Sequence, residues 1–471
     1  MAMTIAFDNS YAQLPDAFFT LLAPTAVKSP KLLAFNDNLA KVMGIDTGDL
    51  PDLAAVFGGN QTPSGAMPLA QLYAGHQFGN FNPQLGDGRA ILLGEVVGTD
   101  GIRRDIQLKG SGQTPYSRMG DGRAWLGPVL REYVVSEAMH ALGIPTTRAL
   151  AAVSTGEDIW REQGALPGAV LTRVAQSHLR VGTFQVFAHR GEVDHLRILT
   201  DYAIKRHYPD ATGPMELLRK VCAAQAALIP AWMSVGFIHG VMNTDNCTIS
   251  GETIDYGPCA FMDGFHQNRV FSSIDQQGRY AFGNQPNIAV WNMAQLATSL
   301  IQLFKDKDAA AEEATEIVHA MPAQIEANWL DRFAAKIGIS KPRTEDSDLI
   351  DRLLGLMQND GADFANTFNS LCKPNARDQF ANRGAFDAWA ENWQNRIKDE
   401  PDPRSRMQTA NPQIIPRNHR IEQMIEAVVA GDMAPFHRLM AALATPFENT
   451  DADLQRPPSQ EEIVPATFCG T

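Results

Sequence analysis

The sequence is poor in cysteine and has no long apolar segment. Five cysteines occur among 471 residues, far apart and without a C-x-x-C pair, which argues against a disulfide framework or a zinc site and favours a reducing cytoplasm. The longest apolar stretch, Ala226–Ile238, is too short to span a membrane and contains Pro230. The first residues show no basic region followed by an apolar core, so no signal peptide is expected.

The sequence also has no excess of positive charge. The chain has 53 acidic residues against 40 lysines and arginines, which gives a net charge of −13. Nucleic-acid-binding proteins usually neutralise phosphates with a basic surface, so neither a nucleic acid nor a membrane is expected as a partner. Hydrophobic residues make up 44% and charged residues 20% of the chain, which are globular values. The length allows one large core or two to three domains.

Glycine-rich segments are present, but without the standard nucleotide-binding spacing. Gly-Asp-Gly-Arg-Ala occurs at 86–90 and again at 120–124, and neither copy fits G-x-G-x-x-G or a Walker motif. Glycines let backbone N–H groups approach a phosphate, and each adjacent arginine offers a bidentate partner. A single copy is better interpreted as an Asp-Gly turn. Two identical copies that flank Lys109 favour a nucleotide site.

The segment His-Gly-Val-Met-Asn-Thr-Asp-Asn, from His239 to Asn246, resembles the catalytic loop of a protein kinase, H-R-D-x-x-x-x-N. Asp255-Tyr-Gly follows where a kinase has D-F-G. The position of the kinase base is Val241, which cannot accept a proton, whereas Asp245 stands directly before the asparagine. Carboxylate and amide oxygens suit Mg²⁺, so the motif predicts metal chemistry on a nucleotide with a displaced base. The alternative is that these residues only form turns.

The first half of the chain is predicted to be mixed α/β. Strands are expected at 89–97 and 102–109, joined by an Asp-Gly turn, and in the second strand polar and apolar residues alternate so that Lys109 points away from the apolar face. A glycine-rich loop then leads to a helix at 126–142 that carries Glu132. This is the order of a kinase small lobe, in which the strand lysine pairs with the helix glutamate. A solvated Lys109 is the alternative.

The second half is predicted to be mostly helical. The first of its helices should deliver the chain to His239. Segment 398–412 contains three prolines and no periodicity, and is predicted to be a surface loop, while 456–471 is expected to be extended. The expected helices cover 216–232, 291–304, 309–320, 362–371 and 420–429.

At these motifs the sequence resembles the selenoprotein O (SelO) family, pseudokinases that act as protein adenylyltransferases. The likeness extends over nearly the whole chain. The matching segments are Leu85–Ala90, Gln107–Arg118, Gly120–Ala124, His239–Asn246, Asp255–Pro258, Gln277–Tyr280, Asn411-Pro412 and Arg417-Asn418.

The resemblance implies a kinase-like bilobal α+β fold with a small β-rich N-terminal lobe, residues 1–175, and a large, mostly helical C-terminal lobe, residues 176–471. It also implies that ATP binds flipped relative to kinases, so that the α-phosphate faces the acceptor. AMP would then be transferred to a Ser, Thr or Tyr hydroxyl of target proteins. The implied cofactors are ATP and Mg²⁺, with Mn²⁺ as an alternative ion.

The same resemblance implies a role for each site residue. Asp245 would be the base, Asn246 and Asp255 would bind the metal ion, and Glu132 would pair with Lys109. The residues implied to hold ATP are Gly86, Gly88, Arg89, Lys109, Asp121, Gly122, Arg173 and Arg180. Without the resemblance, each of the two last arginines would be interpreted as a surface or salt-bridging residue.

Two other functions remain open on the sequence. One is a phosphotransferase that uses Asp245 as a displaced kinase base, and the other is a silent nucleotide-binding scaffold. The scaffold is disfavoured because a complete metal site accompanies Lys109 and Glu132. The family also carries a cysteine or selenocysteine near its C-terminus, here Cys469, and a redox pair with Cys259 is a further hypothesis. Two inert thiols are the alternative.

Overall fold

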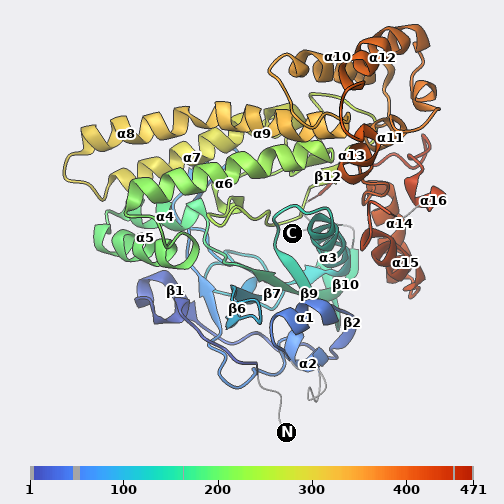
Figure 1. The fold of residues 1–471 in the computed structure, drawn as a ribbon. Coiled ribbons are helices and arrows are strands. Elements are labelled where there is room, and N and C mark those ends of the chain that lie inside the picture. Colours follow the sequence, from blue (N-terminus) through green and yellow to red (C-terminus); the bar gives the residue numbers. More distant parts are fainter. Residues whose placement is uncertain (1–4, 46–52, 163, 449–450, 469–471) are drawn as a thin grey trace.

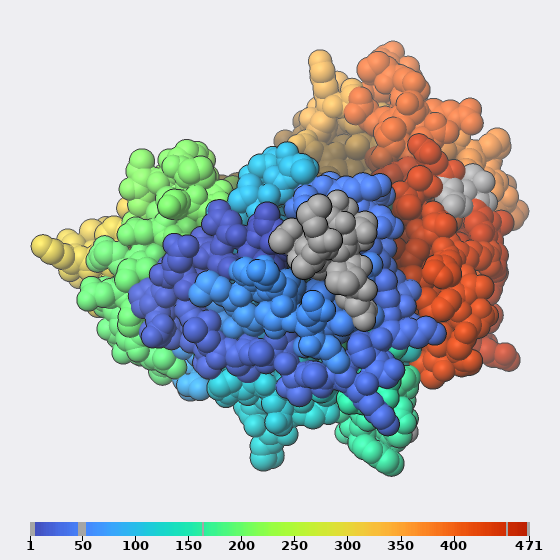
Figure 2. Space-filling model, turned by 90° about the horizontal axis from the view of Figure 1, so that it is seen from below, coloured from blue at the N-terminus to red at the C-terminus, as the bar shows by residue number. Residues whose placement is uncertain are grey.

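The computed structural model describes residues 5–45, 53–162, 164–448 and 451–468. Strands dominate the N-terminal part and helices dominate the rest, so the fold is mixed α/β. In Figure 1 the sheet lies in the lower half, and a layer of long helices in green and yellow lies above it. Figure 2, seen from below, shows the N-terminal residues covering the lower face, between the green helices on one side and the orange and red C-terminal helices on the other.

Eight strands form one sheet whose paired strands are antiparallel. Its order is β1-β3-β6-β7-β10-β9-β2, with β8 paired to β10. Two small two-stranded sheets, the hairpin β4–β5 and the pair β11–β12, stand apart from this sheet. The strands are β1 Phe19–Leu21, β2 Lys31–Phe35, β3 Leu69–Gln71, β4 Gly75–Gln77, β5 Asn80–Asn82, β6 Ala90–Val97, β7 Arg103–Lys109, β8 Ala124–Trp125, β9 Arg148–Arg161, β10 Gly164–Ala175, β11 Phe237–Ile238 and β12 Ala260–Phe261.

Both predicted strands are confirmed, as β6 and β7. Ile106 and Leu108 pack into a core cluster on one face of the sheet. Asp105, Gln107 and Lys109 lie on the other face, as the alternation predicts. That face is buried as well, and Lys109 is only 9% exposed. The alternative of a solvated Lys109 is therefore wrong, because ion pairs with helix and loop carboxylates cover this face of the strand.

Helices make up most of the remaining chain. In the upper layer, α7, α8 and α9 pack against α6 (Figure 1). The helices α14 and α15 lie beside α3. The helices are α1 Asp37–Val42, α2 Leu53–Phe57, α3 Leu126–Ala141, α4 Val181–Arg190, α5 Val193–His207, α6 Pro214–Ser234, α7 Gln285–Ile301, α8 Lys307–His319, α9 Met321–Lys336, α10 Asp346–Asp360, α11 Phe364–Ser370, α12 Arg383–Ile397, α13 Pro403–Ala410, α14 Asn418–Val429, α15 Ala434–Leu443 and α16 Ala452–Gln455.

The six predicted helices are all present, with shifted ends. The predicted helix at 126–142 is α3, which is buried on nearly all sides and ends before Gly143 at φ +74°. The helix predicted at 291–304 is α7, which begins earlier because Pro286 favours the first helical turn. Within the described ranges, no helix combines the length and the apolar character that a membrane span requires.

The predicted surface loop at 398–412 is wrong, because it contains α13. Asp402 accepts a hydrogen bond from the Ser405 backbone N–H at 3.1 Å and so caps the helix. Pro403 occupies the first helical turn, where its missing N–H and fixed φ do no harm. One of the three prolines that suggested a loop therefore begins a helix instead.

One lysine is buried in the helical part without a carboxylate partner. Lys336, the last residue of α9, is 2% exposed. Its Nζ lies 4.3 Å from the ring centroid of Phe368 and 5.4 Å from that of Phe364. Among the described residues no acidic side chain forms an ion pair with it, and burial lowers the pKa of Lys336 to about 7.

Candidate active site

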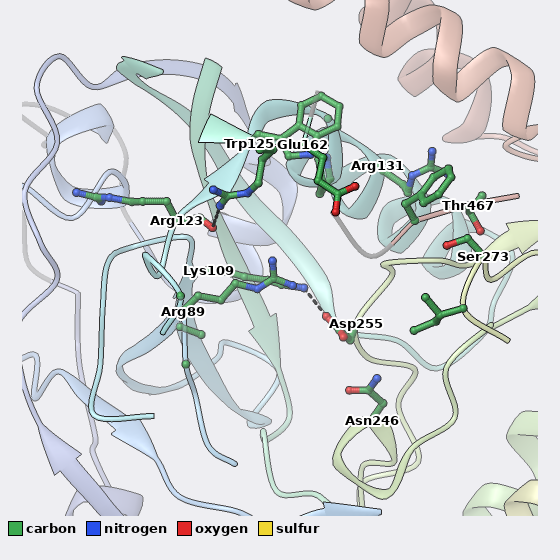
Figure 3. A pocket seen from close by; sticks show the side chains of 18 of the residues that line it. Arg89, Lys109, Arg123, Trp125, Arg131, Glu162, Asn246, Asp255, Ser273 and Thr467 are labelled. Atoms are coloured by element: carbon green, nitrogen blue, oxygen red, sulfur yellow. Dashed lines mark hydrogen bonds and ion pairs between the residues drawn. The ribbon is translucent and has the colours of Figure 1, made fainter. Parts of the chain in front are cut away.

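A cavity of about 1640 Å³ opens where the sheet meets the helical part. The glycine-rich loops, the 239–246 loop, the Asp-Tyr-Gly segment and the C-terminal tail all contribute to its wall (Figure 3). It gathers the predicted site residues Gly86, Gly88, Arg89, Lys109, Asp121, Gly122, Arg173, Arg180, Asp245, Asn246 and Asp255. The remaining one, Glu132, lies behind Lys109 and contacts it from α3.

A buried network of opposite charges lies at the centre of the cavity. The Lys109 Nζ donates to Glu132 Oε2 at 2.5 Å, and it also contacts Asp255. The Arg173 guanidinium donates to the second Glu132 oxygen at 3.2 Å and lies 3.9 Å from Asp255. Glu132 thus holds two cations in place while leaving their charge directed at the cavity. The expected pairing of Lys109 with Glu132 is present.

Asp255 is held ionised in a strained backbone conformation. Its φ is +68°, which is rare for a residue other than glycine and is typical of functional sites. Burial acts to raise the pKa of its carboxyl, but the cations of Lys109 and Arg173 outweigh burial and hold the pKa far below its usual range. The group is therefore a carboxylate at any physiological pH.

Asn246 and Asp255 offer oxygen ligands for a hard cation. The Asn246 amide nitrogen donates to the Val241 carbonyl at 3.1 Å, an arrangement that leaves its amide oxygen available. No group of three or more His, Cys, Asp or Glu side chains suited to a metal occurs in the described part of the chain. An ion here would need additional oxygens from a phosphate ligand, which is how Mg²⁺ is commonly bound in nucleotide sites. The donor set fits such an ion.

Asp245 is the other carboxyl in the cavity, and its surroundings differ from those of Asp255. It is 8% exposed, and burial raises the pKa of Asp245 to about 6. Its Oδ2 accepts a hydrogen bond from the Gln77 amide at 3.1 Å, while its Oδ1 has no hydrogen-bond partner within the described residues. A carboxyl with a pKa near 6 is a carboxylate at neutral pH and can still accept a proton effectively, as a general base must.

His239 holds the same loop in place. Its Nε2 lies 2.8 Å from the Ile254 carbonyl, and its backbone N–H donates to the Gln285 side chain at 3.0 Å. Burial lowers the pKa of His239, so the ring is neutral. The ring links the loop to the segment directly before Asp255 and has a structural role.

The two Gly-Asp-Gly-Arg copies share a sequence but have different surroundings. Asp87 is 2% exposed and accepts hydrogen bonds from the Gln71 backbone and the Gln107 amide. Asp121 is exposed and pairs with Arg161 at 2.7 Å. The first copy is thus anchored to the sheet, and the second forms an outer rim of the cavity.

The glycines of both copies are needed for close loop packing. A Cβ at Gly86 would lie 2.5 Å from the Tyr116 ring, and one at Gly122 would lie 2.1 Å from the Gly112 carbonyl oxygen. Both residues also have positive φ, at +116° and +68°. A side chain at Gly86 would push the first copy away from the 110–122 loop, and one at Gly122 would distort that loop itself.

Arg173 and Arg180 are both buried, at 3% and 5% exposure, so the surface interpretation of these residues is wrong. The Arg180 guanidinium lies 3.6 Å from an Asp87 oxygen and 4.2 Å from the centroid of the Tyr73 ring. A buried arginine stacked on an aromatic ring keeps its planar fork in one orientation. Both guanidinium groups reach the cavity wall beside Lys109.

The C-terminal tail closes one side of the cavity. Thr467 pairs with Ser272 in a parallel bridge, and its hydroxyl donates to the Pro258 carbonyl at 2.6 Å. Ser273 and Thr467 therefore lie together at the rim, as Figure 3 shows. The tail thus rests on the segment that follows Asp-Tyr-Gly.

The thiols bear on the redox hypothesis. Cys259 is 1% exposed, and burial raises the pKa of its thiol to about 12. Cys469 lies outside the described residues, so the structure does not test a bond between the two. A protonated, buried thiol reacts slowly, so the surroundings of Cys259 favour an inert residue.

Sequence reasoning missed several residues of the cavity wall. Gln77 lies on the β4–β5 hairpin, and Arg131 lies on α3, where it contacts Glu422 of α14. Each meets the site through contacts between distant parts of the chain. The only local signal was Gly79, since glycine suits the second position of a tight hairpin turn.

One family model and several known proteins match nearly all of this chain. The family model described as "Protein adenylyltransferase SelO" matches residues 1–444. A protein of Roseobacter denitrificans named protein nucleotidyltransferase YdiU is 68% identical over 471 residues, with all of both chains covered. Proteins of the same name from Ruegeria pomeroyi and Agrobacterium fabrum are 66% identical over 473 residues, with all of both chains covered, and 54% identical over 488 residues, with 99% of each covered. The chain therefore belongs to the SelO family of protein adenylyltransferases.

Proposed function

We propose that this chain transfers AMP from ATP to a Ser, Thr or Tyr hydroxyl of target proteins in a reaction that depends on Mg²⁺. The observation that supports the proposal is that two carboxyl groups in one cavity have different surroundings and different pKa values. Asp255 is fixed among cations that lower its pKa, whereas burial outweighs the nearby Arg180 cation at Asp245 and raises its pKa to about 6. The first suits a metal and phosphate site, and the second suits a general base.

The proposal includes a kinase-like bilobal fold with a boundary between residues 175 and 176. The last strand of the large sheet ends at Ala175, and α4 begins at Val181, which supports a boundary in this region. Residues 1–175 would carry the nucleotide loops, Lys109 and Glu132. Residues 176–471 would carry Asp245, Asn246 and Asp255.

In the proposed reaction, the acceptor hydroxyl oxygen attacks the α-phosphorus of ATP. The hydroxyl proton passes to the Asp245 carboxylate, the bond from the α-phosphorus to its bridging oxygen breaks, and pyrophosphate leaves with the electron pair. ATP would lie flipped relative to a kinase, so that its α-phosphate faces Asp245. Lys109, Arg173 and Arg180 would hold the phosphates, because their buried charges need no reorganisation during the reaction.

Asn246 and Asp255 would hold the Mg²⁺ ion, or Mn²⁺ as an alternative. When bound, the ion would neutralise negative charge on the phosphates. The glycines and Arg89 of the first copy and Asp121 and Gly122 of the second would bind the outer part of the nucleotide. We further propose a cytoplasmic location, which the free thiols of Cys222, Cys247, Cys259 and Cys372 support.

A labelling experiment separates this function from its two rivals. Purified protein is incubated with Mg-ATP labelled on either the α- or the γ-phosphate, and intact-protein mass spectrometry identifies the adduct. AMP transfer predicts protein-bound α-label and released pyrophosphate. Label from the γ-position alone would favour the phosphotransferase, and label from neither position with ATP still bound would favour the scaffold.

Three variants assign the roles within that experiment. Asp255→Ala should abolish labelling, because one of the two proposed ligands of the metal ion is lost. Asp245→Ala should reduce labelling ~100-fold or more while ATP binding is kept, because a base acts on the acceptor. Asp210→Ala is the matched control, since this aspartate is exposed and pairs only with Lys220 among the described residues.

A further inference from the structure

A short hairpin from the N-terminal part of the chain lies directly on the loop that carries Asp245. The hairpin consists of β4 and β5, joined by Phe78 and Gly79. Three of its consecutive residues bond three consecutive residues of the loop. The His76 N–H donates to Thr244 Oγ1 at 2.7 Å, the Gln77 amide to Asp245 Oδ2 at 3.1 Å, and the Phe78 N–H to Asn243 Oδ1 at 3.0 Å.

Of these three bonds, only the one from Gln77 uses a side chain of the hairpin. The bonds from His76 and Phe78 come from backbone N–H groups, which any residue except proline supplies. Replacing the Gln77 side chain therefore removes the contact with Asp245 and leaves the two neighbouring attachments in place. Backbone groups of the hairpin therefore hold the loop, and the Gln77 side chain holds the Asp245 carboxylate.

The second oxygen of the same carboxylate is held by the same strand. A Cβ at Gly75 would lie 2.8 Å from Asp245 Oδ1 and 3.1 Å from Asp245 Cβ. The bare Cα of this glycine therefore lets the carboxylate pack directly against β4. One oxygen is bonded by Gln77 and the other rests on Gly75, so β4 fixes the orientation of the whole group.

The turn of the hairpin is strained, which is a separate sign of function. Phe78 has φ +51° and Gly79 has φ +83°, so both central residues are left-handed, as a type I′ turn requires. Asparagine or glycine is usual at the first position, and an aromatic residue there is unfavourable. The Phe78 ring packs edge-on against Tyr280 at 5.0 Å, and the Tyr280 hydroxyl donates to the same Asn243 oxygen at 2.6 Å. Contacts with the loop hold the strained turn.

From these contacts we infer that Gln77 is a positioning residue that aims the Asp245 carboxylate at the acceptor hydroxyl. The inference rests on the proposed function, in which Asp245 accepts the hydroxyl proton. Gln77 does not touch the reacting atoms and acts only through Asp245. Since a displacement of about 1 Å in a reacting group can slow a reaction ~100-fold, loss of this bond should lower the turnover rate and spare nucleotide binding.

A double-mutant cycle tests the inference. Gln77→Met keeps the length of the side chain and removes its donor. We expect the turnover rate for α-label transfer to fall ~10- to 100-fold, with the KM for ATP and the dissociation constant of Mg-ATP changed less than twofold. In the Asp245→Ala background the same substitution should cause no further loss, because its effect passes through the missing carboxylate. Asn80→Ala, an exposed position in the same hairpin, is the control.

Each outcome decides the inference. Losses that multiply in the double variant, or a Gln77→Met enzyme as active as the wild type, would overturn it. Weaker ATP binding with an unchanged turnover rate would also overturn it and assign Gln77 to the nucleotide site.

Failure of the proposed function is distinguishable from failure of this inference. Label transferred from the γ-position would reject AMP transfer, while the cycle would still measure the coupling between Gln77 and Asp245. If neither label is transferred, crystal structures of the wild type and Gln77→Met decide. An Asp245 carboxylate in the same orientation in both would refute the positioning role, and a rotated one would support it.

Discussion

Replacing Lys336 with methionine should make the protein more stable at neutral pH. The ammonium group of this lysine is buried against Phe364 and Phe368, and its pKa is lowered from 10.5 to about 7. Each unit of that difference corresponds to about 1.4 kcal/mol, so the buried charge destabilises the fold by ~3–5 kcal/mol at pH 7. Methionine has a similar length, fills the same space and carries no charge.

The pH dependence gives the prediction its sign. Between about pH 7 and pH 10.5 the unfolded chain binds a proton at Lys336 that the folded chain does not, so the stability of the wild type rises with pH over this window. Lys336→Met has no amino group at this position, so this contribution to the pH dependence of its stability is absent. The variant should therefore exceed the wild type most at pH 7, and its advantage should shrink as the pH approaches 10.5.

Urea unfolding monitored by tryptophan fluorescence at pH 7, 8, 9 and 10 measures the difference. Lys341→Met, at an exposed lysine, is the matched control and should give a small difference that does not change with pH. Two results would refute the reasoning. One is a variant less stable than the wild type at pH 7, which would mean that the contacts with the two rings outweigh the loss of hydration. The other is an advantage that stays constant between pH 7 and pH 10.

Two further predictions concern the cavity, and a third concerns the thiols. The kcat/KM for AMP transfer should rise with pH through about 6 and be ~10-fold lower at pH 5 than on its plateau, because Asp245 must lose its proton before it can accept one; a flat profile from pH 5 to 8 would contradict this role. Gly122→Ala should weaken ATP binding at least ~10-fold in calorimetry, because its Cβ would lie 2.1 Å from the Gly112 carbonyl. Gly101→Ala is the control: Gly101 also has a positive φ, but its Cβ would meet open space, so ATP binding should be unchanged. Iodoacetamide mapping of the folded protein should modify Cys372 before Cys259, whose buried thiol has a pKa of about 12; equal rates would show that Cys259 becomes exposed.

The residues that meet at the centre of the cavity could be named from the sequence because their motifs are local and ordered. Lys109 ends a strand with a clear alternation, and Glu132 lies on a helix with a clear apolar period. Asn246 and Asp255 stand in short segments after a strong helix. Each could be placed on its element without knowing how the elements pack, and the kinase-like order supplied the pairing.

The hairpin that contacts Asp245 could not be predicted in the same way. Its strands contain three residues each, too few for a period, and its bonds to the 243–245 loop join residues 165 to 168 positions apart. No local pattern reports such a contact. The proline-rich start of α13 failed for the opposite reason, since Pro403 suggested a loop although proline also suits a first helical turn.

The burial of long cationic side chains also could not be predicted from the sequence. A lysine in the last turn of a helix interacts favourably with the helix dipole and usually faces water, so Lys336 gave no sign of lying in the core. Arg173 in β10 and Arg180 just before α4 looked like surface or salt-bridging residues, because long cationic side chains are mostly exposed. Whether a long cationic side chain is buried depends on what packs over it, and that is decided by distant segments.

The attachment of the tail at Thr467 has a consequence for the biosynthesis of the protein. The cavity wall draws on residues from Tyr73 to Phe468, so some parts of it leave the ribosome long before others. Domains generally fold as they emerge, N-terminal parts first. Lys109, Asn246 and Asp255 can thus come together before the segment that rests on Ser272 exists. A chain released early by a premature stop would keep the charged centre of the cavity and leave one side of it open to water.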